Sequence, residues 1–580
     1  MTDKSVSFIR SMCMGQIEED VLFPYPGMAE QEKETLRSVA EALESMLGPH
    51  EKDFRHWDRQ GEFPPEYVGE LREFGAFGFV IPEEHGGMGF GSQAYSRALQ
   101  EIAKYDGSTA VTIGAHSSIG MRGLLLFGNA EQRARFYPKL ATGEMIAAFC
   151  LTEPEAGSDA ASIKTTAIED GDAYVLNGNK LWITNGGIAQ FFTVFAKTGP
   201  EGAKGQITAF LVTSDMEGVS VGTHEDKMGL RASSTTTVHF DNVRVPKDMV
   251  LGEVGQGFKV AMKILNSGRT GLGGGCVGMM KKCVELSTKQ AKERKQFGQP
   301  IADFGMVKQK IGQMVVDCYA SESTVNMVAS LMDQGYEDYA VEAAISKVFA
   351  TEAAWRTIDE ALQIAGGNGF MCEYPYERML RDSRINRIFE GTNEILRLFI
   401  ALTGMSDVAT QLADLVNIRK SVFSDPIKGF GVLQDYALKH AQLATGLKRP
   451  KTHFTKVVPE LAAEAEALEE ATRELAAAAD RILRKHGKNI IGKQFASKRL
   501  ADIMVDMFVW TCVLARVNTA IERSGSQAAA REIEILSIFS GQARKRIRAN
   551  FRAIDDNDDE LVKSVADHAI ENEKYGWDNL

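Results

Sequence analysis

The sequence predicts a multidomain, mainly α-helical protein with a central β domain. We expect an N-terminal helical domain, a middle β-barrel-like domain, a C-terminal four-helix bundle and an appended C-terminal helical domain. Two observations lead to this fold class. The length of 580 residues exceeds what one ordinary hydrophobic core supports. Apolar residues recur at helical spacing through most of the chain, but between about residues 146 and 250 they alternate and are separated by turn residues.

The first predicted domain, residues 1–145, is helical. Its segments LRSVAEALESML, PPEYVGELREFGAFG and SQAYSRALQEIAKYD have helical spacing, and the second begins with the proline typical of a helix entrance. A further segment, TAVTIGAHSSIGMRGLLLFG, is apolar and rich in small residues. Such a helix lets a neighbouring backbone or a long apolar ligand approach closely, and ordinary helix packing is the favoured explanation.

The second predicted domain, residues 146–250, consists of β-structure. The segment KTTAIEDGDAYVLNGNKLWITNGG has turn residues at Asp170-Gly171 and at Asn177-Gly178, between alternating segments. Both dipeptides are typical of hairpin turns, so we expect a turn at each. The segments QITAFLVT, VSVGTH and STTTVHFDNVRVP continue the strand pattern.

Helix returns in the third predicted domain, residues 251–405. Its glycine-rich run GLGGGCVG superficially resembles a dinucleotide-binding pattern, but it follows a helical segment and no βαβ unit surrounds it. We therefore reject a Rossmann fold. The fourth domain, residues 406–580, contains long amphipathic runs after a basic connector at about residues 440–460. Its most apolar run, MVDMFVWTCVLARV, is short for a membrane span and includes Asp506 and Arg516, which favours a buried helix.

Composition narrows the class of protein. A formal net charge of −12 and the lack of a basic, aromatic-interleaved patch argue against nucleic-acid binding. The seven cysteines are scattered without a CxxC pair, which indicates free thiols in a reducing compartment and predicts no metal site. The N-terminus resembles neither a signal peptide nor a transit peptide. We therefore expect a bacterial cytoplasmic protein, although a mature mitochondrial chain would look similar.

One turn stands out as a candidate reactive site. Glu390 lies in the sequence Phe389-Glu390-Gly391-Thr392, between two predicted helices and next to apolar residues. Desolvation in such surroundings raises the pKa of a carboxyl group and makes the carboxylate a better base. The alternative is a solvated turn residue, which the local sequence alone favours.

Three further stretches carry polar groups suited to ligand binding. In AAFCLTEPEAGSDAASIKT (147–165), loop amides have the potential to face an anionic or carbonyl-rich ligand. In KLWITNGG (180–187), Trp182 precedes Thr184 and Asn185, so it is either a core residue or the wall of a site for a flat ring. In ERKQFGQPI (293–301), polar residues flank Phe297, which on its own suggests only a helix C-terminus.

Together these stretches resemble a known family. AAFCLTEPEAGSDAA and QIAGGNGFMCEYPYERMLRDSRINRIFEGTNEILR are similar to the two signature regions of the acyl-CoA dehydrogenases. The helical–β–helical order agrees over about residues 30–405. The added C-terminal helices and the opening SFIRSMCMGQIEEDVLFPYP resemble the very-long-chain branch, so the resemblance covers nearly the whole chain.

The resemblance implies non-covalently bound FAD and a homodimer. It implies that the flavin is lined by Phe149, Leu151, Thr152, Gly157 and Ser158, and that one of its faces is covered by Trp182, Ile183 and Thr184. It implies that the ADP half is held across the dimer interface by Arg294, Gln296, Phe297, Gln363, Gly366 and Gly367. It also implies contacts with the cofactor, after the catalytic turn, from Thr392 and Glu394. Many family members have Gln where this chain has Glu394, which puts that contact in doubt.

The resemblance also implies the reaction. Glu390 would remove the α-proton of a long-chain acyl-CoA while a hydride leaves the β-carbon, giving a trans-2-enoyl-CoA in the first step of fatty acid β-oxidation. Electrons would pass to electron-transfer flavoprotein. The residues expected to contact the acyl-CoA are Ser158, Arg269, Phe389, where many members have Tyr, and Gly391.

The sequence also allows other interpretations. An acyl-CoA oxidase, or a non-enzymatic assembly scaffold on the same fold, would share much of the sequence pattern. A deep acyl cleft rests on the branch resemblance and on five small residues: Gly114, Ala115, Ser117, Ser118 and Gly120. A peripheral contact with an anionic membrane is one interpretation of five connector cations, and a solvated loop is the other. Those cations are Lys448, Arg449, Lys451, His453 and Lys456.

Overall fold

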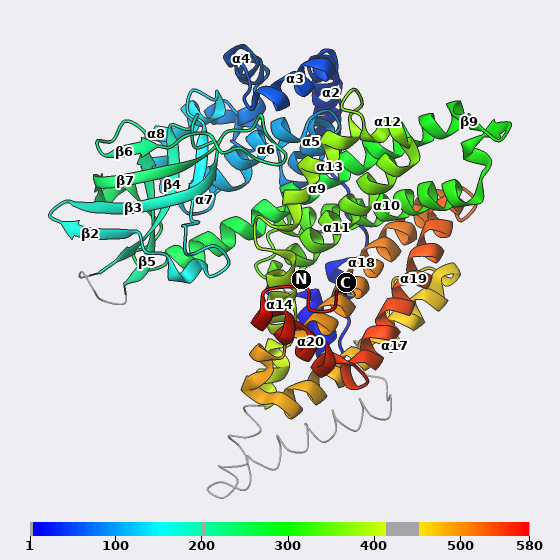
Figure 1. Ribbon diagram of the computed structural model, residues 1–580. Helices are drawn as coiled ribbons and strands as arrows, with labels where there is room; N and C mark the ends of the chain where they lie inside the picture. Colours follow the sequence, from blue (N-terminus) through cyan, green and yellow to red (C-terminus); the bar gives the residue numbers. More distant parts are fainter. Residues whose placement is uncertain (1–3, 200–204, 413–451, 579–580) are drawn as a thin grey trace, which may run out of the picture. The chain divides into compact units, whose positions relative to one another are not determined.

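The computed structural model describes residues 4–199, 205–412 and 452–578 (Figure 1). The chain forms two compact units. The first consists of Met1–Ser5 and Pro24–Ile395, and the second consists of Val6–Phe23 and Leu396–Leu580. The segment Val6–Phe23 therefore packs with the C-terminal helices, although it begins the chain.

The first unit begins with helices whose ends follow from local sequence. Pro65 occupies the first position of α4, and Asp106 caps α6 by accepting a hydrogen bond from the Thr109 amide (2.7 Å). The segment Gly107–Phe127 is long and apolar enough to cross a membrane, but 61% of its apolar window is buried within the protein. The helices are α2 (Glu30–Leu47), α3 (Glu51–Gln60), α4 (Pro65–Phe74), α5 (Ser92–Ala103), α6 (Gly107–Gly114), the π-helix η5 (Ala115–Gly120), α7 (Arg122–Phe127) and α8 (Ala130–Ala141).

A β domain follows, as predicted (Figure 1). Its strands run in the order β6-β7-β3-β2-β4-β5-β8, and β1 pairs in parallel with β4. They are β1 (Ala147–Cys150), β2 (Thr166–Asp170), β3 (Ala173–Thr184), β4 (Phe191–Thr198), β5 (Gln206–Thr213), β6 (Val219–Val221), β7 (Thr235–Pro246) and β8 (Val250–Leu251).

Of the two predicted hairpin turns, one is correct and one is wrong. Gly171 has φ +62° in the turn between β2 and β3. Asn177 and Gly178, however, lie inside β3, where the register against β7 shifts. A Cβ on Gly178 would lie 2.4 Å from the Thr165 hydroxyl oxygen, so this glycine permits close packing within the sheet.

The third part of this unit is the helical bundle, in which α9 packs on both α5 and α11. The run GLGGGCVG lies within α9, as expected from the rejection of a Rossmann fold. A Cβ on Gly278 would lie only 2.1 Å from the carbonyl oxygen of Gln100, so the glycines let α5 and α9 approach closely. The elements are α9 (Gly257–Glu293), β9 (Lys295–Gln296), β10 (Gln299–Pro300), α10 (Gly305–Asp333), α11 (Ala340–Ala365), α12 (Gly367–Phe370) and α13 (Tyr376–Arg384). The next helix, α14 (Asn393–Gly404), begins in this unit and continues into the second.

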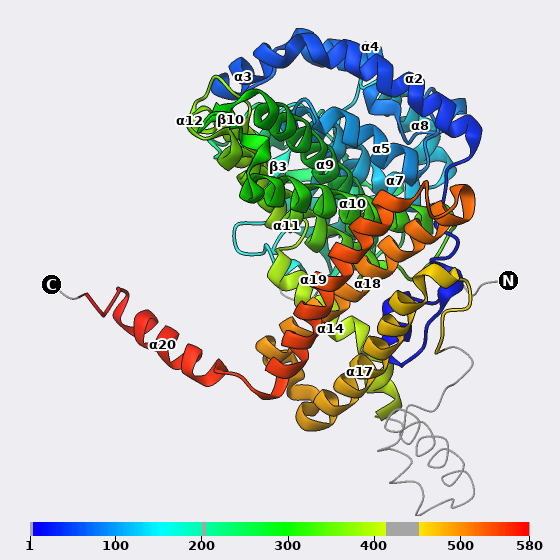
Figure 2. The ribbon, with the colours of Figure 1, turned by 90° about the vertical axis from the view of Figure 1, so that its right-hand side faces the viewer.

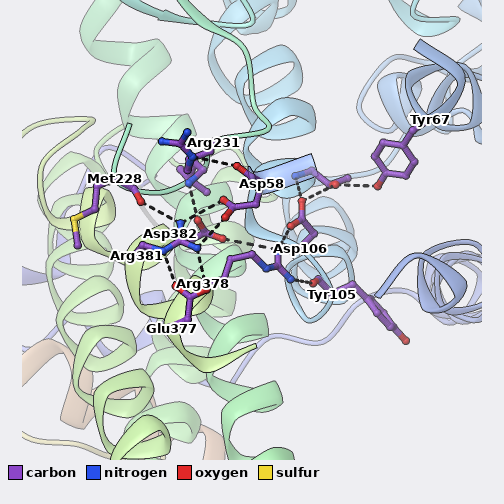
Figure 3. A network of polar contacts seen from close by, with 12 residues as sticks. Asp58, Tyr67, Tyr105, Asp106, Met228, Arg231, Glu377, Arg378, Arg381 and Asp382 are labelled. Atoms are coloured by element: carbon purple, nitrogen blue, oxygen red, sulfur yellow. Dashed lines mark hydrogen bonds and ion pairs between the residues drawn. The ribbon is translucent and has the colours of Figure 1, made fainter. Parts of the chain in front are cut away.

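A network of ion pairs joins α13 to distant parts of the first unit (Figure 3). Arg381 donates to Asp58 of α3 (2.8 Å), to Glu377 (2.7 Å) and to the carbonyl oxygen of Met228 in the β6–β7 loop (3.1 Å). One turn earlier, the buried Arg378 pairs with Asp106 at the start of α6. The helix that precedes Glu390 is thereby fixed to both the N-terminal helices and the β domain.

The second unit is helical. Its core is built around α18, whose run Met504–Val517 is buried almost throughout, with Trp510 and Phe508 fully buried. The expectation of a buried helix is therefore confirmed, and Figure 2 shows α17, α18 and α19 side by side. The helices are α1 (Phe8–Cys13), α17 (Ala462–His486), α18 (Gln494–Ser524), α19 (Ala530–Asp555) and α20 (Asp559–Asn572).

Candidate active site

The predicted catalytic turn lies between the 3₁₀-helix η9 (Ile385–Arg387) and α14. Glu390 and Gly391 both have left-handed backbone conformations, with φ +56° and +92°. A residue other than glycine seldom adopts this conformation, and such strain is concentrated at functional sites. The amide N–H of Glu390 donates to no other group that the structure describes.

Two buried cations hold this turn through its carbonyl groups. Arg269 of α9 donates from Nε to the carbonyl oxygen of Glu390 (3.4 Å). Lys347 of α11 donates from Nζ to the carbonyl oxygen of Gly391 (2.8 Å) and to Oδ1 of Asn393 (2.8 Å). Burial lowers the pKa of Arg269 to about 10 and that of Lys347 to about 8. Both side chains thus place positive charge close to the carboxylate without forming a salt bridge with it.

The carboxyl group of Glu390 is desolvated. Its Oε2 atom is buried without a hydrogen-bond partner among the described groups. Burial raises the pKa of Glu390 to about 7, against the opposing attraction of Arg269 and Lys347. A Cβ on Gly268 of α9 would lie 2.9 Å from Oε2, so a glycine is needed to seat the carboxyl group. A carboxylate in these surroundings suits proton abstraction near neutral pH.

The residues expected to surround the flavin ring come from two neighbouring segments of the β domain. The amide of Leu181 donates to the carbonyl oxygen of Thr152 (2.9 Å), which brings the loop after β1 beside the end of β3. Trp182 has φ +55° and is 62% exposed, an unusual state for a tryptophan. Along the same two segments Phe149 and Thr152 are half-buried, Leu151 and Ile183 are buried, Thr184 is half-buried, and Gly157 and Ser158 are exposed.

The residues expected to hold the ADP half lie at two helix ends. Arg294 follows α9, and Gln296 and Phe297 belong to the hairpin formed by β9 and β10. Phe297 is 95% exposed with φ +52°. Gln363, Gly366 and Gly367, at the end of α11, are exposed as well. No hydrogen bond within the described chain joins one group to the other, and their joint role across a dimer interface stays a prediction.

The remaining predicted residues adjoin the catalytic turn. Thr392 accepts a hydrogen bond from the Ile395 amide (3.3 Å) and so begins α14, and Glu394 is exposed in its first turn. Phe389 is half-buried, and Gly391 is bonded through its carbonyl group as described above. The Arg269 guanidinium donates to the turn, and its contact with the substrate stays a prediction.

Lys347 and Asn393 complete the site but were not predicted. Lys347 is a lone lysine in the apolar run AAISKVFA, and a charged residue at such a position of a buried helix is a signal of a specific partner. Asn393 donates to Thr351 Oγ1 (3.1 Å) and Glu352 Oε1 (3.1 Å), which ties the start of α14 to α11.

Four family models match successive parts of the chain. The models for the acyl-CoA dehydrogenase N-terminal, middle and C-terminal domains match residues 29–144, 148–243 and 255–404. The model for the ACAD9/ACADV C-terminal domain matches residues 459–575.

Individual relatives agree with these matches. The mitochondrial very long-chain specific acyl-CoA dehydrogenase of Homo sapiens is 42% identical over 563 residues, which cover 95% of this chain and 84% of the relative. A probable acyl-CoA dehydrogenase of Bacillus subtilis is 34% identical, covering 92% of this chain and 88% of that protein. A solved acyl-CoA dehydrogenase from Bacillus anthracis, complexed with FAD, superposes with a TM-score of 0.79 at 32% identity and covers 96% of this chain and 94% of that one. The chain belongs to the acyl-CoA dehydrogenase family.

Proposed function

We propose that this protein is an FAD-dependent acyl-CoA dehydrogenase that oxidises long-chain or very-long-chain acyl-CoA to trans-2-enoyl-CoA. It would act in the first step of fatty acid β-oxidation, as a homodimer, and pass electrons to electron-transfer flavoprotein. The observation that carries the proposal is the Glu390 carboxyl group, which is desolvated, unpaired at Oε2 and flanked by two buried cations.

The residues assigned to FAD fit such a group. Trp182 and Phe297 are large apolar side chains left exposed, as expected of surfaces that a flat ring or a second subunit covers. A Cβ on Gly157, Gly366 or Gly367 would meet no atom within 4 Å, so these backbones face open space that a ligand has room to enter. When bound at these residues, FAD supplies the acceptor for the hydride that leaves the substrate β-carbon.

The chain's own residues account for the removal of the proton. Glu390 takes the α-proton, and its pKa of about 7 keeps a large fraction of the carboxyl group ionised at neutral pH. The α-C–H bond of a thioester is a weak acid, so the site must also stabilise the negative charge that develops on the thioester oxygen. The unbonded N–H of Glu390 is a suitable donor for that oxygen. Arg269 and Lys347 fix the turn that carries both the base and this donor.

An anaerobic visible spectrum tests the proposal. Purified protein should be yellow, and its flavin absorbance should bleach when palmitoyl-CoA is added. The Glu390→Gln variant should keep its flavin but react more slowly by about 10²–10⁴-fold, because an amide does not accept the proton. A yellow wild-type protein that fails to bleach with any acyl chain length would contradict the proposal, and peroxide formation in air would indicate an oxidase.

The expected membrane contact and location are separate proposals. Lys448, Arg449 and Lys451 lie outside the described residues. His453 pairs with Glu469 (2.5 Å) and Lys456 with Asp20, so these two cations already have partners within the second unit. The relatives include both mitochondrial and bacterial proteins. Co-sedimentation with anionic vesicles at low and high salt tests the membrane contact. If the contact exists, the protein should bind the vesicles at low salt and bind them less at high salt.

A further inference from the structure

A polar pocket lies close to Glu390, between α5, η5, α9 and the end of α10. Its cavity volume is about 10 Å³. That is room for one water or one small polar group. The lining is mostly polar: Ser92, Tyr95, Ser117, Ser118, Arg122, Ser267 and Thr270, with Val80, Gly271 and Met332.

Arg122 dominates the chemistry of this pocket. Its guanidinium forms no hydrogen bond or ion pair with any group in the described part of the chain, and its Nε atom is buried. Burial lowers the pKa of Arg122, which shows how incompletely the charge is solvated. The nearby carboxylate of Asp333 is already engaged by the amides of Ser92 (2.6 Å) and Gln93 (3.0 Å) at the start of α5. Arg122 as a whole is half-buried, so the costly feature is its buried Nε N–H, which has no partner and lies beside space that a polar group can enter.

A second orphaned group faces the same space. The Ser117 hydroxyl is fully buried and lies close to the Tyr95 hydroxyl, but it forms no hydrogen bond of ordinary geometry with a described group. By contrast, the Tyr95 hydroxyl is bonded to the Ser118 hydroxyl (2.8 Å). Of the five small residues expected to leave a deep cleft, Ser117 and Ser118 thus line this pocket. Gly120 instead packs against Ala147, because a Cβ there would lie 2.8 Å from the Ala147 carbonyl carbon.

The pocket is continuous with the catalytic region along one face of α9. Gly268 contacts the Glu390 carboxyl group, and Ser267 and Gly271, its neighbours on that face, line the pocket. Burial raises the pKa of Tyr95, and the charge of the neighbouring Glu390 adds to this effect. An acyl chain that begins at Glu390 and follows this face of α9 would pass along the pocket that Arg122 lines.

We infer that this pocket receives the far end of the acyl chain and is suited to one that ends in a carboxylate, as in an ω-carboxyacyl-CoA. Arg122 would donate charge-assisted hydrogen bonds to the carboxylate, and the Ser117 hydroxyl would donate another. A methyl end would satisfy neither group and would expel the water that solvates them. The inference rests on the proposed function, because it names the substrate class of that same site.

Matched substrate pairs test the inference. We would compare the CoA thioesters of decanedioic, dodecanedioic and hexadecanedioic acids with the methyl-terminated thioesters of equal length. In the wild-type holoenzyme, at least one dicarboxylic member should exceed its methyl-terminated partner in kcat/KM by about tenfold or more, the effect of a buried hydrogen bond to a charged group. Esterifying the far carboxylate should remove that advantage.

Variants assign the effect to Arg122. Arg122→Met should lower the ratio of carboxyl-terminated to methyl-terminated kcat/KM by about tenfold or more, while Arg122→Lys should keep part of it. Arg37→Met, an exposed arginine on α2, is the matched control and should leave the ratio unchanged. Flavin content and the unfolding midpoint of each variant show whether it folds.

The possible outcomes separate the two proposals. If no acyl-CoA bleaches the flavin, the proposed function fails. If methyl-terminated substrates react and no carboxyl-terminated one is preferred at any length, only the inference about Arg122 is overturned, and the pocket holds water. A preference that survives in Arg122→Met would also overturn it.

Discussion

At the scale of single residues, the pH dependence of turnover follows from the pKa of Glu390. The group must be ionised to accept a proton, and its pKa is about 7. We therefore expect kcat/KM to rise tenfold per pH unit below about pH 7 and to level off above it, provided that chemistry limits the rate. A stopped-flow measurement of flavin bleaching checks this. A profile that levels off near pH 4.5, the ordinary value for glutamate, would contradict the desolvation of Glu390.

The same shift has an opposite consequence for stability. Because burial raises the pKa of Glu390 in the folded state, its contribution favours folding at low pH and is lost as the pH rises through about 7. Activity and this contribution to stability therefore change in opposite directions over the same pH range. If Glu390 is the base, the rest of the fold must offset the free-energy cost of its ionised form.

Lys347 provides a second test at this scale. Replacing Lys347 with Met removes a buried cation that attracts the Glu390 carboxylate and bonds the Gly391 carbonyl (2.8 Å). The pKa of Glu390 should rise, so the midpoint of the pH profile should move upward by about one unit. Lys33→Met, on the surface of α2, is the control and should leave the midpoint in place. A midpoint unchanged in Lys347→Met would show that Lys347 does not act on the carboxylate.

Sequence predicted these residues unevenly. Glu390 could be proposed as the base because its turn, its apolar flanks and the signature around it are all local. Lys347 and Arg122 could not, since a lysine or an arginine in an apolar run indicates only that some partner exists. The fold places the Gly391 carbonyl group beside Lys347, and it places no hydrogen-bond acceptor beside the Nε atom of Arg122. Neither arrangement can be read from the local sequence.

At the scale of elements, the glycines of α9 offer a matched pair of substitutions. A Cβ at Gly278 would lie 2.1 Å from the Gln100 carbonyl oxygen of α5, whereas at Gly275 its nearest neighbour is Ala103 Cβ at 3.9 Å. Gly278→Ala should force α5 and α9 apart and lower the free energy of unfolding by about 1–3 kcal/mol. Gly275→Ala should raise it by about 0.5–1 kcal/mol, since alanine favours helix more than glycine does. Urea unfolding of both variants decides whether packing, and not helix propensity, selects glycine at position 278.

Element types were predicted more reliably than their irregularities. Helices such as α4 and α5 carry their own periodicity and end signals, so their existence is local information. Asn177-Gly178 misled because its turn chemistry is real but is overridden by pairing of β3 with β7 on one side and with β2 on the other. The π-helix Ala115–Gly120 was also not predicted, and it carries Ser117 and Ser118 of the polar pocket.

At the scale of the whole molecule, the order of domains was predictable and their attachment was not. Composition changes along the chain marked the helical, β and helical parts, and the family signatures fixed the fold. The polar network around α13 joins residues 153 to 323 positions apart in sequence, and no local pattern shows which groups will meet. The grouping of Val6–Phe23 with the second unit is equally non-local.

The network makes a prediction about the first unit as a whole. Arg381 bridges α3, α13 and the β6–β7 loop, and Asp58, its partner, is buried (Figure 3). Arg381→Met should destabilise the first unit by about 3 kcal/mol, because it leaves the Asp58 carboxylate without its partner. Adding Asp58→Asn should recover part of that loss, since the neutral amide no longer needs a cation. Lys139→Met, which breaks an exposed pair with Glu144, should change the stability by less than about 1 kcal/mol. If the double variant is no more stable than Arg381→Met alone, the arginine acts through packing, and the charge pair does not hold these parts together.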